Sequence, residues 1–359
     1  MEANDLIKEC ISKIVEGRDL ARIEAEKIMS EIMLGKATEA QIAAFLTAIK
    51  MKGESIEEIT AFASVMRKFC HRINPKVTGP LVDTCGTGGD IIKTFNISTV
   101  AAFVAAGSGI AIAKHGNRSV TSKCGSADVL EALGFNLEMN PKLVEQSIEK
   151  IGIGFMFAPN FHPAMKYAIG PRREIGIRTV FNILGPLSNP ANAKIQLLGV
   201  YDENLIDLFA EVLYNLSVKR AMIVHGIDGL DEISTIGKTK IALLNEGDVS
   251  KSYINPLDLG IKTVNRNELT GTDPKASASI IYKILNFSNN CISKLGPKRD
   301  IVLINAAAAI FLGGEARTME EGIEMARESI QSGSAYSKLK SLIKFSNGDM
   351  SKLEEMENG

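Results

Sequence analysis

The part of the sequence best suited to chemistry is a glycine-rich loop at residues 82–90, which reads Val-Asp-Thr-Cys-Gly-Thr-Gly-Gly-Asp. Because the glycines leave the backbone almost bare, several N–H groups can point into one concavity and hold a phosphate or pyrophosphate. A helix capped by Asn96 or Ser98 is predicted to run through Val100 to Ala106 and to aim its positive end at the same concavity. The spacing matches neither a Walker loop nor the G-x-G-x-x-G dinucleotide fingerprint, so an ordinary strand-to-helix turn is the alternative.

A basic cluster follows the next apolar strand, Ile110–Ala113, and reads Lys-His-Gly-Asn-Arg-Ser-Val-Thr-Ser from Lys114 to Ser122. Three potentially cationic side chains and three hydroxyls suit a multiply phosphorylated anion. Charge runs of this kind are more often solvated loops, but the buried strand before the cluster and the nearby glycine loop favour a binding site. We interpret His115 as a neutral, packed side chain.

Two adjacent carboxylates, Asp231 and Glu232, lie in a turn that follows a third apolar strand and its His225. Carboxylates at such a junction, opposite a phosphate site, are what Mg²⁺ prefers as protein ligands. Neighbouring residues of an extended chain point in opposite directions, so the pair could bridge two ions instead of sharing one. A solvated acidic turn is the alternative, and the spacing does not resemble a zinc site because His225 has no partner at ligand distance.

Arginines form the last cluster, in the run Pro171-Arg172-Arg173-Glu174 with Arg178 behind it. This segment is predicted to face the cleft opposite the phosphates, where a guanidinium could hold the carboxylate of a second substrate by two parallel hydrogen bonds. The residue types alone do not separate Arg172 from Arg173, and one of the two can simply pair with a surface carboxylate.

Composition places the chain among ordinary globular proteins. Its 359 residues are 45% hydrophobic and 23% charged, with a net charge of −1. That balance gives no support to a nucleic-acid or acidic-membrane binder, and no apolar run reaches transmembrane length. The five cysteines are scattered, which favours reduced thiols in the cytoplasm. We interpret Cys85 and Cys124 as small packing residues rather than nucleophiles.

The elements that must position these clusters form two units of different character. Residues 1–73 have helical apolar periodicity, with capping boxes at Thr38 and Ser55, and predict a small all-helical domain. Short apolar strands then alternate with helices over 76–158 and 187–346, which predicts an α/β domain with a mainly parallel sheet covered by helices. The Pro-bounded helical stretch 161–186 is expected to leave the sheet and pack on the helical domain, making that domain discontinuous. Residues 347–359 are expected to be a frayed, charged tail.

These clusters belong to a longer series of segments that resembles the anthranilate phosphoribosyltransferase family of tryptophan biosynthesis. The resemblance covers nearly the whole chain, to about Ser346. The segments occur in order as Asp83-Thr-Cys-Gly-Thr-Gly-Gly-Asp90, Thr94-Phe-Asn-Ile-Ser-Thr99, Lys114-His-Gly-Asn-Arg-Ser119, Gly125-Ser-Ala-Asp-Val-Leu-Glu131, Asn182-Ile-Leu-Gly-Pro-Leu187 with Asn189-Pro190, and His225-Gly-x-Asp-Gly-Leu-Asp-Glu232.

The resemblance implies an enzyme that moves the 5-phosphoribosyl group of 5-phosphoribosyl 1-diphosphate (PRPP) to anthranilate, with Mg²⁺ in the cleft, two ions per subunit, and a homodimer formed through the helical domain. It implies metal ligation by Ser98, Asp231 and Glu232, and anthranilate contacts from Gly86, Asn117 and Arg172. It implies PRPP contacts from Gly86, Gly89, Asp90, Thr94, Asn96, Ile97, Ser98, Thr99, Lys114, His115, Gly116, Asn117, Arg118, Ser119, Val120, Thr121, Ser122 and Ser126. Since the nucleophile is a neutral amine, we assign no catalytic base and expect positioning and electrostatic stabilisation of the departing pyrophosphate to dominate.

Two positions depart from the family pattern without removing a ligand: Ile91 replaces a smaller or polar residue, and Thr121 replaces the more usual serine. A pyrimidine nucleoside phosphorylase of the same architecture is the nearest alternative, but it would use inorganic phosphate without Mg²⁺, against the Asp231–Glu232 pair and Asn117–Arg118. A non-catalytic nucleic-acid-binding relative should carry a basic surplus that this chain lacks. We therefore expect no nucleic-acid partner and no membrane partner.

Overall fold

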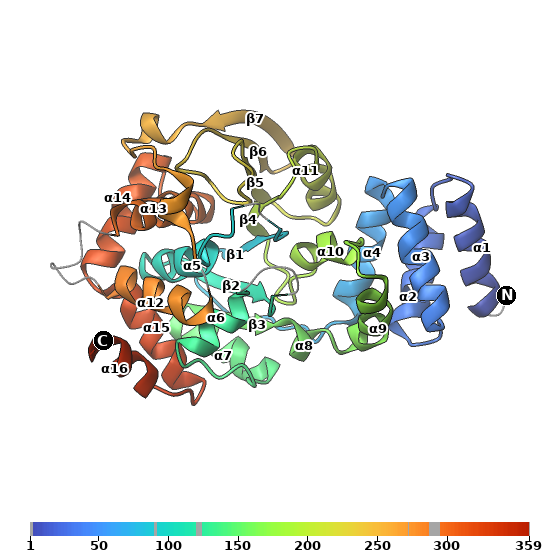
Figure 1. Ribbon diagram of the computed structural model, residues 1–359, viewed down its shortest axis with the longest axis horizontal. Helices are drawn as coiled ribbons and strands as arrows, with labels where there is room; N and C mark the ends of the chain where they lie inside the picture. Colours follow the sequence, from blue (N-terminus) through green and yellow to red (C-terminus); the bar gives the residue numbers. More distant parts are fainter. Residues whose placement is uncertain (1–2, 90–91, 120–123, 272, 287–294, 359) are drawn as a thin grey trace.

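The computed structural model describes residues 3–89, 92–119, 124–271, 273–286 and 295–358, arranged as a helical bundle beside a larger α/β body (Figure 1). The bundle consists of α1 (Ala3–Val15), α2 (Arg22–Met33), α3 (Glu39–Lys52) and α4 (Ile56–Phe69). Both predicted capping boxes are present: the Thr38 hydroxyl accepts from Gln41 N at 3.2 Å and the Ser55 hydroxyl from Glu58 N at 3.3 Å. These caps satisfy N–H groups that would otherwise be orphaned at the helix starts.

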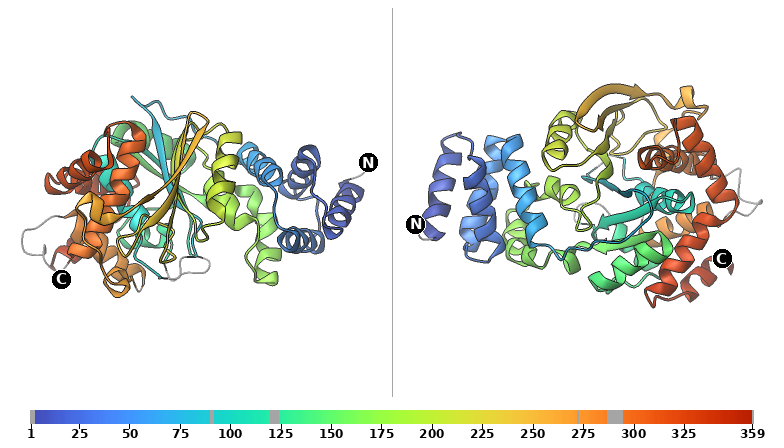
Figure 2. Two further views of the ribbon diagram at one scale, coloured as in Figure 1. Left: turned by 90° about the horizontal axis from the view of Figure 1, so that it is seen from above. Right: turned by 180° about the vertical axis from the view of Figure 1, so that it is seen from behind.

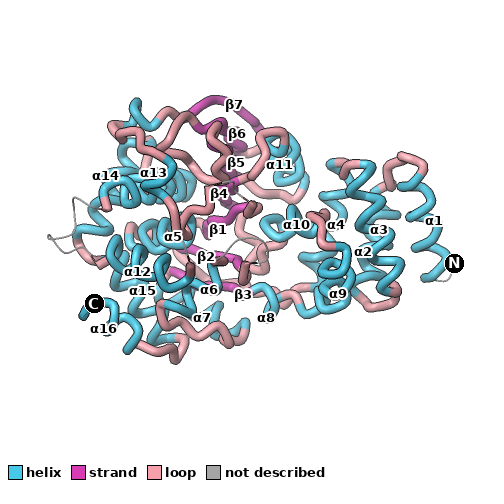
Figure 3. Tube along the Cα trace, in the orientation of Figure 1, coloured by secondary structure: helices cyan, strands magenta, loops and turns pink. Residues whose placement is uncertain are grey.

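A seven-stranded sheet runs through the body in the order β3-β2-β1-β4-β5-β6-β7 (Figure 3). The five strands from β3 to β5 are parallel, which confirms the predicted mainly parallel sheet. The last two strands form an antiparallel hairpin that the sequence analysis did not anticipate. The strands are β1 (Leu81–Gly86), β2 (Ala111–Gly116), β3 (Ile153–Phe157), β4 (Ile195–Gly199), β5 (Arg220–Gly226), β6 (Thr239–Asn245) and β7 (Asp248–Ile254).

The sheet lies between two layers of helices (Figure 2), and alternate residues of the central strands belong to the core on one side or the other. Leu197 and Met222 pack into the hydrophobic cluster beneath α5 (Ile97–Gly107) and α13 (Gly296–Gly313). Leu198 and Ile223 pack on the opposite face, in the cluster shared with the bundle. The period of two in a pleated strand makes this division possible, and it buries both faces of the sheet as parallel sheets require.

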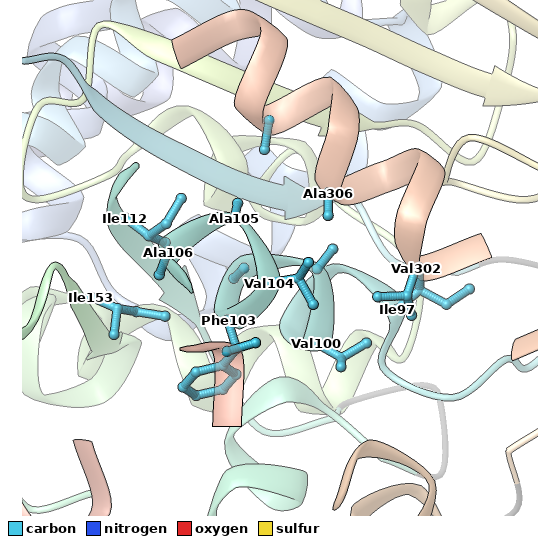
Figure 4. Close-up of a cluster of buried hydrophobic side chains, with 14 of the residues drawn as sticks. Ile97, Val100, Phe103, Val104, Ala105, Ala106, Ile112, Ile153, Val302 and Ala306 are labelled. Carbon is cyan, nitrogen blue, oxygen red and sulfur yellow. The ribbon is translucent and has the colours of Figure 1, made fainter. Parts of the chain in front are cut away.

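Helix α5 lies at the centre of the first layer and is buried on nearly all sides (Figure 4). It packs against α13, α14 (Met319–Gln331) and α15 (Ser334–Phe345). A side chain at Gly107 would collide with Ser329 and with the backbone of Ala335, so glycine permits this close approach. Because α5 is packed against these three helices, its N-terminus is held in place and faces the glycine-rich loop.

The chain leaves the sheet after β3 and returns at β4 through a short series of helical pieces. Helix α9 packs on α2 and α3 of the bundle, and α10 packs on α4. The pieces are α8 (Ala158–Phe161), the 3₁₀ turn η1 (Pro163–Met165), α9 (Lys166–Ile175) and α10 (Phe181–Leu187). This stretch therefore lies between the bundle and the α/β body.

Residues 347–359, expected to be frayed, include a helix, so that expectation is wrong. Helix α16 (Ser351–Asn358) packs on α12 (Pro274–Leu285), and Leu353 is only 2% exposed. Asp349 N donates to Gly134 O at 2.7 Å and anchors the start of this segment. The charged composition of this segment predicts a solvated tail. In three dimensions, however, its few apolar side chains reach an existing core.

The remaining elements complete the covering of the sheet. They are α6 (Ser126–Ala132), α7 (Pro141–Ile151), α11 (Leu205–Asn215), η2 (Pro256–Leu259) and η3 (Arg266–Leu269). None of the helices in the described part of the chain combines the length and apolar content needed to cross a bilayer.

Candidate active site

A cavity of about 530 Å³ lies at the carboxyl ends of the central parallel strands. Strand β1 is followed in the chain by β2 on one side, while its neighbour β4 leads to β5 on the other, so the strand order reverses between β1 and β4. Open α/β sheets bind ligands at such a switch point. The cavity wall includes the glycine-rich loop, the start of α5, the end of β2, the start of α6, and parts of α9 and α10.

The glycine-rich loop has two glycines in left-handed backbone conformations, Gly88 with φ +64° and Gly89 with φ +92°. Gly86 does not have a positive φ, so its backbone conformation does not require glycine. Space is the reason instead: a Cβ at Gly86 would lie 2.8 Å from Asp231 Oδ2. The loop is tied to β4 because Thr87 N donates to Gly199 O at 2.9 Å.

The start of α5 is capped by a side chain from elsewhere in the sequence. Asn96 occupies the N-cap position, but its side chain forms no cap hydrogen bond and instead donates to Cys124 O at 3.3 Å. Glu232 Oε1 accepts from Ser98 N at 3.0 Å in its place. The N–H groups of this helix end therefore face the cavity and already hold an anionic oxygen.

Asp231 plays the same part for the loop, since its Oδ2 accepts from Gly88 N at 2.9 Å. Two of the three predicted metal ligands, Asp231 and Glu232, thus accept from backbone N–H groups on different elements, one in the loop and one in α5. Asn305, buried in α13, holds the turn by accepting from Ile233 N at 2.9 Å and donating to Ile233 O at 2.9 Å. No feature of the sequence had marked Asn305, because its role depends on a helix that begins more than sixty residues later.

The donor set at this point fits a hard cation. Two carboxylates and the Ser98 hydroxyl supply oxygen, which Mg²⁺ prefers, and Mg²⁺ commonly takes only one or two carboxylates and completes its shell with phosphate oxygens and water. No cluster of three or more His, Cys, Asp or Glu side chains that could hold a metal occurs in the described residues. The geometry suits an ion carried with a phosphorylated ligand better than a site formed by protein alone.

Lys114 lies within β2 rather than in a loop and is buried. Its Nζ donates to Thr84 O at 2.6 Å and to the Ser98 hydroxyl at 3.2 Å. Burial lowers the pKa of this ammonium, while the carboxylate of Asp83 opposes that shift. Lys114 therefore joins β1 to the start of α5 and is one of the residues that line the cavity.

Two histidines, the half-buried His115 and the buried His162, lie with ring centroids 5.0 Å apart and also line the cavity. Burial lowers the pKa of His115 to about 3 and that of His162 to about 4, so both are neutral at pH 7. This agrees with the interpretation of His115 as a packed, uncharged side chain. In the described part of the chain, Nε2 of each ring has no hydrogen-bond partner.

Arg118, predicted to contact phosphate, pairs with carboxylates of α6 in the absence of a ligand. Its Nη1 lies 3.0 Å from Asp128 Oδ1 and 2.8 Å from Glu131 Oε2, and Nη2 donates to Glu131 Oε1 at 2.8 Å. These two carboxylates raise the pKa of the guanidinium. Arg118, Asn117, Ser119 and Ser126 all line the cavity. The predicted contacts Asp90, Val120, Thr121 and Ser122, and the departure at Ile91, lie outside the described residues.

The structure separates the two adjacent arginines of α9. Arg172 lines the cavity, with its guanidinium 5.2 Å from the ring centroid of Phe181, whereas Arg173 is exposed. Burial lowers the pKa of Arg172, and no carboxylate of the described residues counters that shift. An uncompensated, half-buried cation at a cavity wall is suited to an anionic ligand group.

Neither cysteine at the site is activated. Burial raises the pKa of Cys85 well above its usual value, and burial also raises the pKa of Cys124 to about 11. Both thiols are protonated at neutral pH and line the cavity as small side chains.

Comparisons with known proteins agree with this geometry. Residues 8–70 match the family described as "Glycosyl transferase family, helical bundle domain", and residues 78–336 match "Glycosyl transferase family, a/b domain". Anthranilate phosphoribosyltransferase of Acetivibrio thermocellus is 51% identical over 346 residues, covering 96% of this chain and 98% of the relative. That of Methanocorpusculum labreanum is 53% identical over 343 residues, covering 96% and 99%. The chain belongs to the anthranilate phosphoribosyltransferase family.

Solved structures of this family superpose on nearly the whole chain. The Thermus thermophilus enzyme has a TM-score of 0.87 at 38% identity, covering 94% of this chain and 99% of that one. The Saccharomyces cerevisiae enzyme in complex with PRPP and Mg has a TM-score of 0.87 at 28% identity, covering 95% and 98%. The same yeast enzyme in complex with 4-fluoroanthranilate has a TM-score of 0.86 at 27% identity, covering 96% and 98%.

Proposed function

We propose that this chain transfers the 5-phosphoribosyl group of PRPP to the amine of anthranilate, with release of pyrophosphate, as the second step of the tryptophan branch. The observation that carries the proposal is the pair of backbone donors, Gly88 N and Ser98 N, that face one cavity and each hold a carboxylate oxygen. Backbone N–H groups that donate to a carboxylate oxygen of the protein can also donate to the phosphate oxygens of a ligand.

The PRPP side of the cavity is proposed to comprise the glycine loop, the start of α5 and the basic segment. The residues are Gly86, Gly89, Asp90, Thr94, Asn96, Ile97, Ser98, Thr99, Lys114, His115, Gly116, Asn117, Arg118, Ser119, Val120, Thr121, Ser122 and Ser126. In the reaction the bond between C1 of the ribose and the pyrophosphate oxygen breaks, and its electrons leave with pyrophosphate. Loop N–H groups and Lys114 stabilise that growing charge without having to reorganise.

Ser98, Asp231 and Glu232 are proposed to hold Mg²⁺, with two ions per subunit. The two carboxylates support this number because they lie against donors on different elements, Gly88 and Ser98, and so diverge from each other. When bound, Mg²⁺ supplies further electrostatic stabilisation of the departing pyrophosphate. The protein contributes an oxygen-only donor set and a rigid turn held by Asn305.

Anthranilate is proposed to contact Arg172 on the opposite wall and to reach Gly86 and Asn117 at the edge of the PRPP side. Arg172 supports this because its half-buried guanidinium lines the cavity and no carboxylate among the described residues compensates its charge. The amine nitrogen then forms its bond to C1 and loses a proton. We assign no catalytic base, because pKa values of about 3 and about 4 make His115 and His162 very weak proton acceptors. A weakly basic aromatic amine also needs positioning more than deprotonation before attack.

The test is a fluorescence assay with purified protein, in which anthranilate emission should fall only when PRPP and Mg²⁺ are both present. Omission of either one should abolish the change. Inorganic phosphate with a pyrimidine nucleoside serves as the control for a phosphorylase. Phosphorolysis without loss of anthranilate would overturn the proposed function.

We further propose a cytoplasmic homodimer that forms through the bundle. Apolar side chains exposed on the bundle support this interface: Val15 is 71% exposed, Ile23 65% and Met51 84%. Cytoplasmic location is supported by the free thiols of Cys10, Cys70, Cys85 and Cys124. Sedimentation should give twice the chain mass, and Met51→Glu should shift the population toward monomer. A wild-type monomer at micromolar concentration would contradict the dimer.

A further inference from the structure

Arg178 lies behind the glycine-rich loop, in the connection between α9 and α10. Its Nη2 donates to Gly88 O at 2.9 Å and to Thr87 O at 3.4 Å. The cavity wall includes Thr87, Gly88 and Gly89, whereas Arg178 is not one of its lining residues. The guanidinium therefore acts on the outer side of the loop, away from where a ligand would bind.

These two hydrogen bonds determine which way the loop N–H groups point. In a trans peptide the C=O of one residue and the N–H of the next point in opposite directions. When Arg178 holds the carbonyl of Thr87 outward, Gly88 N–H faces inward, and there it donates to Asp231 Oδ2 at 2.9 Å. When Arg178 holds the carbonyl of Gly88 outward, Gly89 N–H faces inward as well.

The guanidinium is itself held in a fixed place. It stacks over the Tyr201 ring, 4.0 Å from its centroid. Tyr201 is joined to the same loop, because its backbone N donates to the Thr87 hydroxyl at 3.1 Å. A Cβ at Gly89 would collide with the guanidinium, so glycine at this position makes room for Arg178 in addition to adopting φ +92°. Arg178 and Tyr201, from two other parts of the chain, thus hold the loop in one arrangement.

We infer that Arg178 is a positioning residue for the glycine-rich loop that binds the diphosphate. It acts through the loop and does not itself contact the substrate. It orients the N–H groups of Gly88 and Gly89 toward the ligand and, by bonding to the carbonyls of these peptides, polarises them into stronger donors. The inference rests on the proposed function, since it assigns those N–H groups to the diphosphate of PRPP. It also joins the two substrate sides, because the same connection follows α9, which carries Arg172.

The deciding variant is Arg178→Met, which keeps much of the side-chain length and removes the donors and the charge. The KM and Kd for PRPP should rise about tenfold to a hundredfold, as expected for the loss of a charge-assisted hydrogen bond, while the anthranilate KM stays within about twofold. Arg173→Met is the matched control, because Arg173 is exposed and lies nearby in the same chain segment. It should keep both KM values.

Two further variants keep the inference testable if Arg178→Met does not fold. Arg178→Lys retains the charge but loses the planar fork and the stacking, and should raise the PRPP KM by less than Arg178→Met. Tyr201→Leu leaves the donors in place, removes the stacking and should shift the same parameter. An unchanged PRPP KM in folded Arg178 variants, or a rise in the anthranilate KM instead, would overturn the inference. A wild-type enzyme without PRPP-dependent activity would overturn the proposed function, so the two failures are distinguishable.

Discussion

Arg172 is placed where a carboxylate on the acceptor would need a partner, half-buried at the cavity wall and above the ring of Phe181. Its neighbour Arg173 points away and is exposed. Asp231 and Glu232 show the complementary situation, since each carboxylate already satisfies a backbone donor of the anion cradle. At the scale of single residues, the site therefore has a cation suited to the carboxylate of the acceptor and two carboxylates suited to a metal ion.

Replacing Arg172 by alanine should weaken anthranilate binding. Loss of a charge-assisted hydrogen bond costs about 1.5–3 kcal/mol, or about one to two decades in affinity. The anthranilate KM should rise by that factor, with kcat and the PRPP KM nearly unchanged because the removed contact is made equally before and during reaction. Steady-state kinetics with Arg173→Ala as the control checks this. The assignment fails if the two variants exchange phenotypes.

The double change Asp231→Asn with Glu232→Gln should separate metal binding from loop structure. Both new side chains keep a carbonyl oxygen for Gly88 N and Ser98 N, so the melting temperature should stay near that of the wild type. Turnover should fall by at least about a hundredfold, because neutral amides are poor ligands for Mg²⁺. Titration of activity against Mg²⁺ is the measurement, and wild-type rates at limiting Mg²⁺ would refute the assignment.

The glycine-rich loop and α5 act as one element of the site, although Asp231–Glu232 and Arg178 join them from other parts of the chain. Asp231 bonds to the inner side of the loop and Arg178 to its outer side. A peptide held from both sides is preorganised, which lowers the cost of ordering it around a ligand. Glycine is required at position 86 for space, and at position 89 for both space and backbone conformation.

Gly86→Val should test that requirement for space. Its Cβ would meet Asp231 Oδ2 at 2.8 Å, which forces the carboxylate or the loop to move. PRPP affinity should fall by about tenfold or more, the equivalent of roughly 1.4 kcal/mol. Calorimetric binding in the presence of Mg²⁺ gives the value. Gly296→Ala is the control, since a Cβ there meets nothing within 4 Å. An unchanged PRPP Kd would show that the loop serves structure alone.

The whole molecule places its two ligand walls on different parts of the fold. The phosphate side belongs to the sheet and α5, whereas Arg172 belongs to α9, which packs on α2 and α3 of the bundle. His115 and His162 lie where these parts meet, one at the end of β2 and the other just after α8. Their burial as neutral rings makes this junction sensitive to acid.

Stability should therefore fall as pH decreases below about 6.5. The pKa of His162 is lowered from 6.5 to about 4 in the folded protein. Between these pH values the unfolded chain therefore binds a proton that the folded protein does not bind. Its contribution is fully present above pH 6.5 and is lost as pH falls toward 4, by on the order of 2 kcal/mol at pH 5. The same sign applies to His115, whose pKa is lowered to about 3.

Urea unfolding of the wild type and His162→Gln at pH 7 and pH 5 measures this effect. The variant should lose less free energy of unfolding between the two pH values than the wild type does, whatever its stability at pH 7. Parallel loss in both proteins would mean that His162 is protonated in the folded state at pH 5.

Local sequence determined the elements and much of the site. Thr38 and Ser55 predicted helix starts because a cap needs only a side chain three residues from an N–H. The apolar strands predicted a mainly parallel sheet, whose carboxyl ends then bring the glycine loop and the carboxylates together. The resemblance of the ordered segments to one family predicted the phosphoribosyl-transfer reaction, and residues of those segments line the cavity.

Tertiary structure decided what each side chain faces, since that depends on partners remote in sequence. Only the fold shows that Arg118 pairs with α6, that Glu232 caps α5, and that residues 351–358 form a docked helix. Arg172 and Arg173 have the same chemistry and adjacent positions, so the orientation of α9 against the bundle had to separate them. Arg178 is the clearest case: its role is set by carbonyls about 90 residues away in the chain, and no local pattern encodes such a contact.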